Sequence, residues 1–141
     1  MQHRLLVIED DRHIAELVCR IAKAAGFEVR SADTLDQIKY QHRHFAPDVI
    51  VLDVLMPEVD GFDVLNYLHE QDSQAKIVLL SGSASYRDMA EKMGTARGLS
   101  VVANLAKPFR APSLRLALEE IRQHLVTFRD ASIEHQRRLP A

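Results

Sequence analysis

The chain has 141 residues, of which 47% are apolar and 27% are charged, and its formal net charge is −2 at pH 7. This length suits one folded domain, and this composition excludes a disordered protein. The balanced charge argues against direct nucleic-acid binding and against attachment to a membrane surface, because such proteins usually carry a basic excess.

Targeting signals and cysteine usage agree with a soluble chain. No apolar run is long enough to span a bilayer and no signal peptide stands at the N-terminus, so we expect a cytoplasmic location. The single cysteine, Cys19, cannot form an internal disulfide. It lies in an apolar stripe, and we predict that it is buried in the core.

Five short apolar runs rich in β-branched residues predict five β-strands. They cover residues 5–8, 27–29, 49–52, 77–80 and 99–102. Three of these runs show little alternation of apolar and polar residues. Continuous apolar runs are typical of strands covered on both faces, as in a parallel sheet.

Between the strands, apolar residues recur at spacings of three and four, which predicts five amphipathic helices. The residues that mark their inward faces are, in chain order, Ile14, Leu17, Val18, Ile21 and Ala25; Leu35, Ile38 and Phe45; Phe62, Leu65 and Leu68; Met89, Ala90 and Met93; and Leu114, Leu118, Ile121 and Leu125. Strands that alternate with helices predict right-handed crossovers and an open, doubly wound α/β sheet.

The end of the chain differs from the rest. We assign residues 1–125 to one domain. Residues 126–141 are polar and mixed in charge, and they either extend the fifth helix or lead, as a linker, to a further output domain. Val126 and Phe128 continue the apolar pattern of the fifth helix, which suits a dimer face or a linker helix equally well.

Polar side chains follow four of the predicted strands, at the edge where the functional site of an open α/β sheet lies. These residues are Glu9, Asp10 and Asp11 after the first strand, Asp53 after the third, Ser81 after the fourth and Lys107 after the fifth. Carboxylate oxygens are the ligands that Mg²⁺ prefers, and a carboxylate can also be the nucleophile that forms an aspartyl-phosphate. A hydroxyl and a lysine can hold phosphoryl oxygens. Asp11 is predicted to cap the first helix instead.

These residues belong to five short motifs that together resemble the receiver domain of two-component response regulators. The motifs are Leu-Val-Ile-Glu-Asp-Asp at 6–11, Val-Leu-Asp-Val-Leu-Met-Pro at 51–57, Asp-Gly at 60–61, Leu-Ser-Gly at 80–82 and Lys-Pro-Phe at 107–109. Each motif is weak alone, but all five in this order are specific. The resemblance covers roughly residues 4–125, and it implies a flavodoxin-like (βα)5 fold with strand order 2-1-3-4-5.

The resemblance also implies a role for each residue. Asp53 would accept the phosphoryl group, and Ser81 and Lys107 would contact its oxygens. Mg²⁺ would be held by four groups, namely the side chains of Glu9, Asp10 and Asp53 and the backbone carbonyl of Leu55. The bond between Lys107 and Pro108 would be cis.

The implied partner is a sensor histidine kinase or a histidine phosphotransfer protein, whose phosphohistidine would be the donor. The domain would be a switch that catalyses only its own phosphorylation and dephosphorylation. It would signal through the face formed by the fourth helix, fifth strand and fifth helix, and this face would also serve a homodimer.

The sequence departs from the family pattern in the stretch between Ser81 and Lys107. Asn104 stands where the family often has a tyrosine or phenylalanine, so the usual readout by ring rotation is missing. The stretch is also longer than in a minimal receiver, which indicates either a tolerated surface insertion or a specialised partner surface. In the family, the residue two after the acceptor and the residue two after the hydroxyl residue affect the water that hydrolyses the phosphoryl group. Here these residues are Leu55 and Ser83. Because the side chain of Leu55 cannot hydrogen-bond to water, we predict a long-lived phosphoryl group.

Three other classes of protein compare with a phospho-accepting receiver as follows. A pseudo-receiver with the same fold would act only as a protein-interaction module, and Asn104 leaves room for it. P-loop NTPases and dinucleotide-binding oxidoreductases are excluded by the absence of their glycine motifs. A dehalogenase-like phosphatase would need a carboxylate at Leu55. No zinc spacing occurs among the seven histidines, which are predicted to be ordinary surface residues: His3, His13, His42, His44, His69, His124 and His135.

Overall fold

The computed structural model describes the backbone of residues 2–137 and the side chains of residues 2–125. Five strands and five helices alternate along these residues: β1 (Arg4–Ile8), α1 (Arg12–Ala24), β2 (Glu28–Ala32), α2 (Leu35–His44), β3 (Val49–Asp53), α3 (Gly61–Glu70), β4 (Lys76–Ser81), α4 (Ala84–Ala96), β5 (Ser100–Ala106) and α5 (Ala111–Arg137). The strands form one parallel sheet in the order β2-β1-β3-β4-β5. The predicted fold is confirmed.

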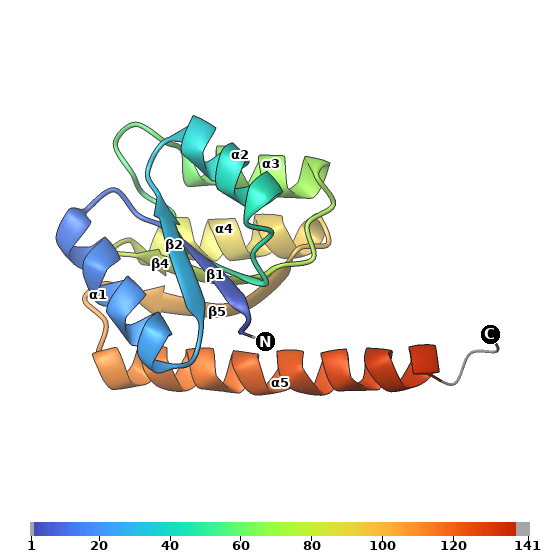
Figure 1. Cartoon of the computed structure of the whole chain (residues 1–141). Helices are drawn as coiled ribbons and strands as arrows, with labels where there is room; N and C mark the ends of the chain where they lie inside the picture. The colour runs from blue at the N-terminus through green and yellow to red at the C-terminus, as the bar shows by residue number, and fades with distance from the viewer. Residues whose placement is uncertain (1, 138–141) are drawn as a thin grey trace.

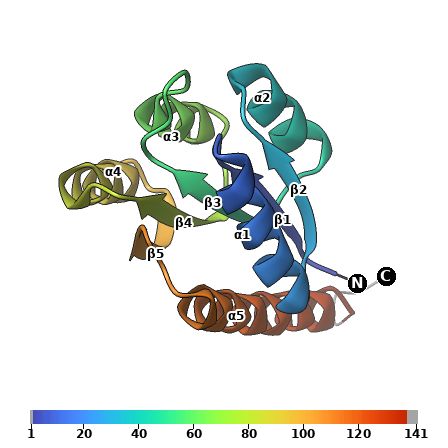
Figure 2. The same ribbon diagram turned by 90° about the vertical axis from the view of Figure 1, so that its left-hand side faces the viewer.

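The sheet is covered on both faces. Helices α1 and α5 lie on one face, and α2, α3 and α4 lie on the other, as Figures 1 and 2 show. Adjacent residues of a strand point to opposite faces. In β1, Leu6 and Ile8 therefore pack into the core beneath α2, α3 and α4, whereas Leu5 and Val7 pack into the core beneath α1 and α5. This two-sided burial explains the continuous apolar runs.

Four helices begin at a residue whose side chain caps the first turn. Asp11 Oδ1 accepts hydrogen bonds from the backbone amides of His13 and Ile14 at 3.0 and 3.2 Å, so the predicted capping role of Asp11 is confirmed. Thr34, Asp60 and Ser83 cap α2, α3 and α4 in the same way. These caps satisfy backbone amides that have no partner within the helix.

Strands β2 and β5 lie further along the chain than predicted. Strand β5 begins at Ser100 and runs to Ala106, and its pairing with β4 shifts register after Ile77, which leaves Val102 as an extra residue. A bulge of this kind inserts one unpaired residue into a strand. The stretch between Ser81 and Lys107 contains the 13-residue α4 and this bulge.

Several predictions of burial were wrong. Met89 is 58% exposed, and Leu17 and Leu35 also lie at the surface. Cys19 is half-buried at the edge of the core, not fully buried. His3 is buried beside Asp48, with its Nδ1 atom 3.5 Å from the carboxylate, so it is not a surface residue.

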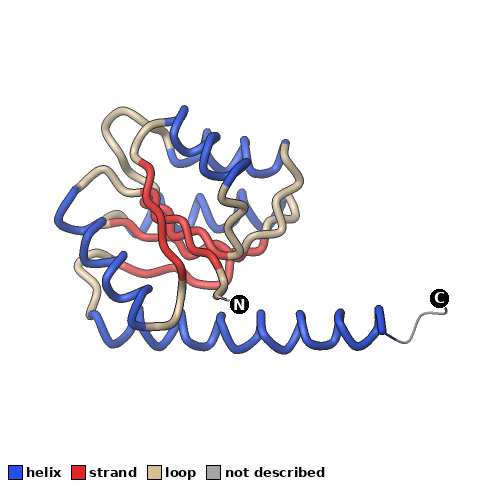
Figure 3. The backbone as a smooth tube through the Cα atoms, in the orientation of Figure 1, coloured by secondary structure: helices blue, strands red, loops and turns tan. Residues whose placement is uncertain are grey.

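Helix α5 continues past the domain body as one unbroken helix, as the tube in Figure 3 shows. Its first part is anchored by Leu114 and Leu118, which are fully buried against the sheet. The side chains of Val126 and Phe128, which would form a dimer face or linker, lie outside the described side chains, as does that of His135. None of the described helices is both long and apolar enough to cross a membrane.

Candidate functional site: an acidic cluster at the strand ends

The candidate site lies where β1, β3, β4 and β5 end. Strand β3 pairs with β1 on one side and with β4 on the other, and it ends at Asp53. Glu9 and Asp10 directly follow β1, so they emerge beside Asp53. Ser81 is the last residue of β4, and its carbonyl accepts a hydrogen bond from the backbone amide of Lys107 at 2.9 Å. Sheet topology thus brings residues from four parts of the sequence to one edge.

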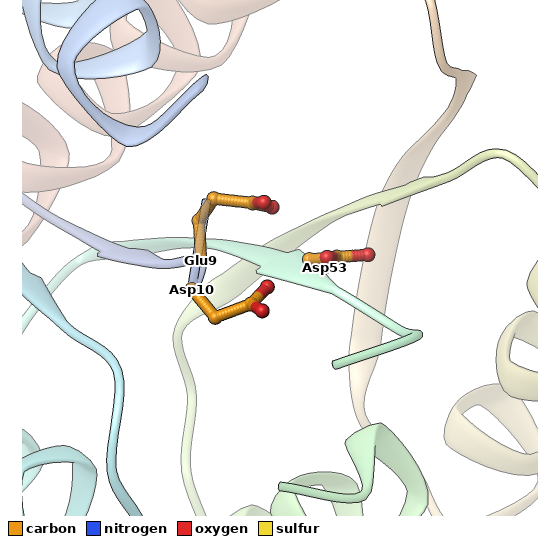
Figure 4. A group of neighbouring side chains, drawn as sticks. All are labelled: Glu9, Asp10 and Asp53. Atoms are coloured by element: carbon orange, nitrogen blue, oxygen red, sulfur yellow. The ribbon is translucent and has the colours of Figure 1, made fainter. Parts of the chain in front are cut away.

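Three carboxyl groups form the centre of the site. Glu9, Asp10 and Asp53 each offer an oxygen that lies within 4.8 Å of the other two, and Figure 4 shows the three side chains gathered beyond the ends of β1 and β3. Glu9 and Asp53 are buried, whereas Asp10 is exposed. The cluster therefore consists of two buried carboxyl groups and one that is exposed to solvent.

Lys107 joins the two buried carboxylates. Its ammonium donates to both oxygens of Glu9, at 3.0 and 2.9 Å, and to Oδ2 of Asp53 at 3.1 Å. The other oxygen of Asp53 accepts from the backbone amide of Leu55 at 3.1 Å. Both oxygens of Asp53 therefore have hydrogen-bond partners, which fixes the orientation of the carboxylate.

Burial dominates the ionisation of Glu9. Removal from water, reinforced by the charge of Asp53, raises the pKa of Glu9 to about 7, and the hydrogen bond from Lys107 opposes this rise. The pKa of Lys107 is raised, since its bonds to the two carboxylates outweigh the cost of its own burial. The site thus holds more negative charge than one lysine can offset.

The donor set fits a magnesium ion. Mg²⁺ binds oxygen ligands at about 2.1 Å, so the ligand oxygens of one ion lie at most about 4.2 Å apart. The oxygens of Glu9, Asp10 and Asp53, which lie within 4.8 Å of one another, approach this spacing. A divalent cation would also offset the surplus negative charge of the cluster.

The loop after Asp53 is held close to the site. Leu55 forms an isolated antiparallel bridge with Asp60, which caps α3. The next residue, Gly61, has no room for a side chain, because a Cβ atom there would lie 2.5 Å from the carbonyl oxygen of Val54. The side chain of Leu55 is 45% exposed. The predicted cis bond between Lys107 and Pro108 is confirmed.

Ser81 is fully buried, and its hydroxyl oxygen accepts from the backbone amide of Ser83 at 3.1 Å. This hydrogen bond connects the site to the start of α4. The structure therefore places Ser81 at the predicted edge, with its hydroxyl engaged by α4.

Asn104 has partners that the sequence analysis missed. Its Oδ1 accepts from a terminal nitrogen of Arg87 at 2.8 Å, and its Nδ2 donates to Glu91 at 2.9 Å. Arg87 and Glu91 are four residues apart in α4 and so share one helix face. The spacing of Arg87 and Glu91 could have indicated that the two side chains share a polar partner, but the sequence does not show that Asn104 faces α4.

Comparison with known proteins agrees with this geometry. A family model described as the response regulator receiver domain matches residues 5–119. The chain belongs to the response regulator receiver domain family, which is the receiving module of two-component signalling.

Individual relatives are similar over most of the chain. The C4-dicarboxylate transport transcriptional regulatory protein DctD of Pseudomonas aeruginosa is 31% identical over 88% of this chain, which corresponds to 25% of DctD. The chemotaxis protein CheY of Bacillus subtilis is 26% identical over 85% of the chain and 98% of CheY. The beryllofluoride-activated NtrC4 receiver domain dimer has a TM-score of 0.71 at 25% identity, covering 86% of this chain and 97% of that one. The chain thus spans a quarter of DctD and nearly all of CheY.

Proposed function

We propose that this domain accepts a phosphoryl group on Asp53 from a phosphohistidine, in a reaction that depends on Mg²⁺. The observation that carries the proposal is the position of Asp53, which is buried between Lys107 and two further carboxylates at the strand ends. A carboxylate in this setting is shielded from water and has a cation at hydrogen-bond distance. A carboxylate nucleophile that forms an aspartyl-phosphate needs such a cation nearby to offset the charge on the phosphoryl oxygens.

The transfer requires one bond exchange. A carboxylate oxygen of Asp53 attacks phosphorus, the P–N bond to the donor imidazole breaks, and the imidazole takes up a proton as it leaves. Lys107 offsets the charge on the phosphoryl oxygens, a role that its hydrogen bond to Asp53 Oδ2 at 3.1 Å supports. Glu9, Asp10, Asp53 and the backbone carbonyl of Leu55 would hold Mg²⁺, which supplies further positive charge when bound.

The partners follow from this chemistry. The donor histidine is provided by a sensor histidine kinase or a histidine phosphotransfer protein, and we place the reaction in the cytoplasm. We assign residues 1–125 to the receiver and the remainder of the chain to a helical extension or linker. A homodimer through α4, β5 and α5 is supported by one exposed apolar residue in each of these elements, Met89, Val102 and Leu116.

The test is the mass of the intact protein after incubation with Mg²⁺ and a small phosphodonor. We expect the wild-type chain to gain one phosphoryl group and Asp53→Asn to gain none. Asp63→Asn is the matched control, because Asp63 is an exposed carboxylate in the first turn of α3, away from the strand ends. No gain in the wild type, under conditions that modify another receiver, would favour a pseudo-receiver.

A further inference from the structure

The first half of α4 has little apolar contact with the rest of the domain. The buried residues of α4 are Ala90, in the middle of the helix, and Gly94, in its second half. Between residues 84 and 89, every side chain is exposed except that of Arg87, which is partly buried. Hydrophobic packing therefore anchors the second half of the helix, whereas the first half has one aromatic contact, between Tyr86 and Phe62 with ring centroids 6.3 Å apart, and otherwise depends on polar contacts.

Two polar links hold this first half. One is the hydrogen bond from the backbone amide of Ser83, the N-cap of α4, to the hydroxyl of Ser81 at 3.1 Å. The other is the amide of Asn104, which accepts from Arg87 at 2.8 Å and donates to Glu91 at 2.9 Å. A side-chain amide has one acceptor end and one donor end, and here a cation and an anion satisfy them.

Both links start from strands that form the phosphorylation site. Ser81 ends β4, and Asn104 lies in β5, three residues before Lys107. Side chains alternate along β5, and because Ala103 and Leu105 pack toward α1 and α5, Asn104 faces α4. A change at the ends of β4 and β5 thus has a short physical route to α4.

The link through Asn104 is not a fully satisfied network. The Nε atom of Arg87 is buried and has no hydrogen-bond partner among the described residues. A buried donor without a partner opposes the arrangement that buries it. The bond to Asn104 therefore holds Arg87 in a position that is only partly favourable, which makes the contact suitable for release.

We propose that Arg87, Glu91 and Asn104 form a polar latch that holds the first half of α4 on β5, and that phosphorylation of Asp53 opens this latch. The second part rests on the proposed function. When the Ser81 hydroxyl turns to a phosphoryl oxygen it leaves the amide of Ser83, and the latch, in which the buried Nε of Arg87 has no partner among the described residues, is too weak to hold the start of α4 alone. The output of this domain is then the release of α4, which takes the place of an aromatic ring rotation.

Amide hydrogen exchange in residues 84–91 tests the latch in the unmodified protein. We expect exchange there to be about tenfold faster in Asn104→Ala than in the wild type, because local opening no longer breaks the two side-chain bonds. Lys92→Ala is the matched control, since Lys92 is exposed on the same helix. Unchanged exchange in β1 and β3 verifies that the variant is folded. Equal exchange of α4 in Asn104→Ala and the wild type would overturn the latch.

The same measurement after phosphorylation tests the coupling. We expect phosphorylation to speed exchange of residues 84–91 in the wild type toward the value of unmodified Asn104→Ala, and to add little in that variant. An equal increase in both proteins, or none in the phosphorylated wild type, would overturn the coupling. If intact mass shows that no phosphoryl group is taken up, the proposed function fails, while the unmodified proteins still decide whether the latch exists.

Discussion

The proposed phosphorylation site and the α4–β5 region are neighbours in the fold but are built differently. At the site, the two buried carboxylates share one lysine, and each residue belongs to a motif that resembles the family pattern. In the α4–β5 region, the contacts are polar and partly exposed, and Asn104 departs from that pattern. We therefore expect Asp53 to follow the chemistry of the family, and we expect the response of α4 to depend on contacts particular to this chain.

The largest effect is expected at Lys107. Lys107→Ala removes the cation that bonds Asp53 and would offset charge on the phosphoryl oxygens, so we expect phosphorylation by a small donor to slow by about 100-fold. The rate of mass gain in the presence of Mg²⁺ measures this. Lys92→Ala should leave the rate unchanged, and a similar loss in both variants would contradict a local role for Lys107.

Magnesium binding is expected to depend on pH through Glu9. A metal ligand must lose its proton before it binds, and the pKa of Glu9 is about 7 in the folded protein. We therefore expect Mg²⁺ affinity, measured by calorimetric titration, to rise by about tenfold from pH 6 to pH 8. In Glu9→Gln the affinity should be lower and nearly independent of pH. A pH-independent affinity in the wild type would contradict the account.

The stability of the magnesium-free domain should show the opposite trend. Because the pKa of Glu9 is higher in the folded state than its ordinary value of 4.5, the folded state binds more protons between pH 4.5 and about 7. The free energy of unfolding contributed by Glu9 therefore falls as pH rises through this window. Urea unfolding at pH 5 and pH 8 should show a larger decline in the wild type than in Glu9→Gln, and equal declines would refute it.

The smallest effect concerns the lifetime of the phosphoryl group. The half-exposed side chain of Leu55 follows Asp53 by two residues and cannot bond an attacking water. We expect the isolated phosphorylated domain to keep its phosphoryl group for minutes, and Leu55→Gln to lose it severalfold faster. Intact mass over time measures the loss, and loss from the wild type within seconds would count against this assignment.

The sequence predicted the features that depend on local pattern. Apolar runs and helical spacing predicted the order of strands and helices. The position of Asp53 and Lys107 directly after predicted strands indicated that they lie at the same edge of the sheet. Contacts between residues that are far apart in the sequence could not be predicted from it. The bulge at Val102 reverses which side chains face α4, and the burial of His3 depends on Asp48 across the sheet. The partners of Asn104 likewise depend on how α4 packs on β5.

The most direct measurement follows two backbone amides by NMR as Mg²⁺ and a phosphodonor are added. The amide of Leu55 bonds to Asp53, and the amide of Ser83 bonds to Ser81, so together they report the site and its link to α4. We predict that both signals shift in the wild type and that neither shifts with the phosphodonor in Asp53→Asn. Signals that stay unchanged in the wild type, or that shift equally in Asp53→Asn, would contradict phosphorylation of Asp53 as the event that this domain transmits.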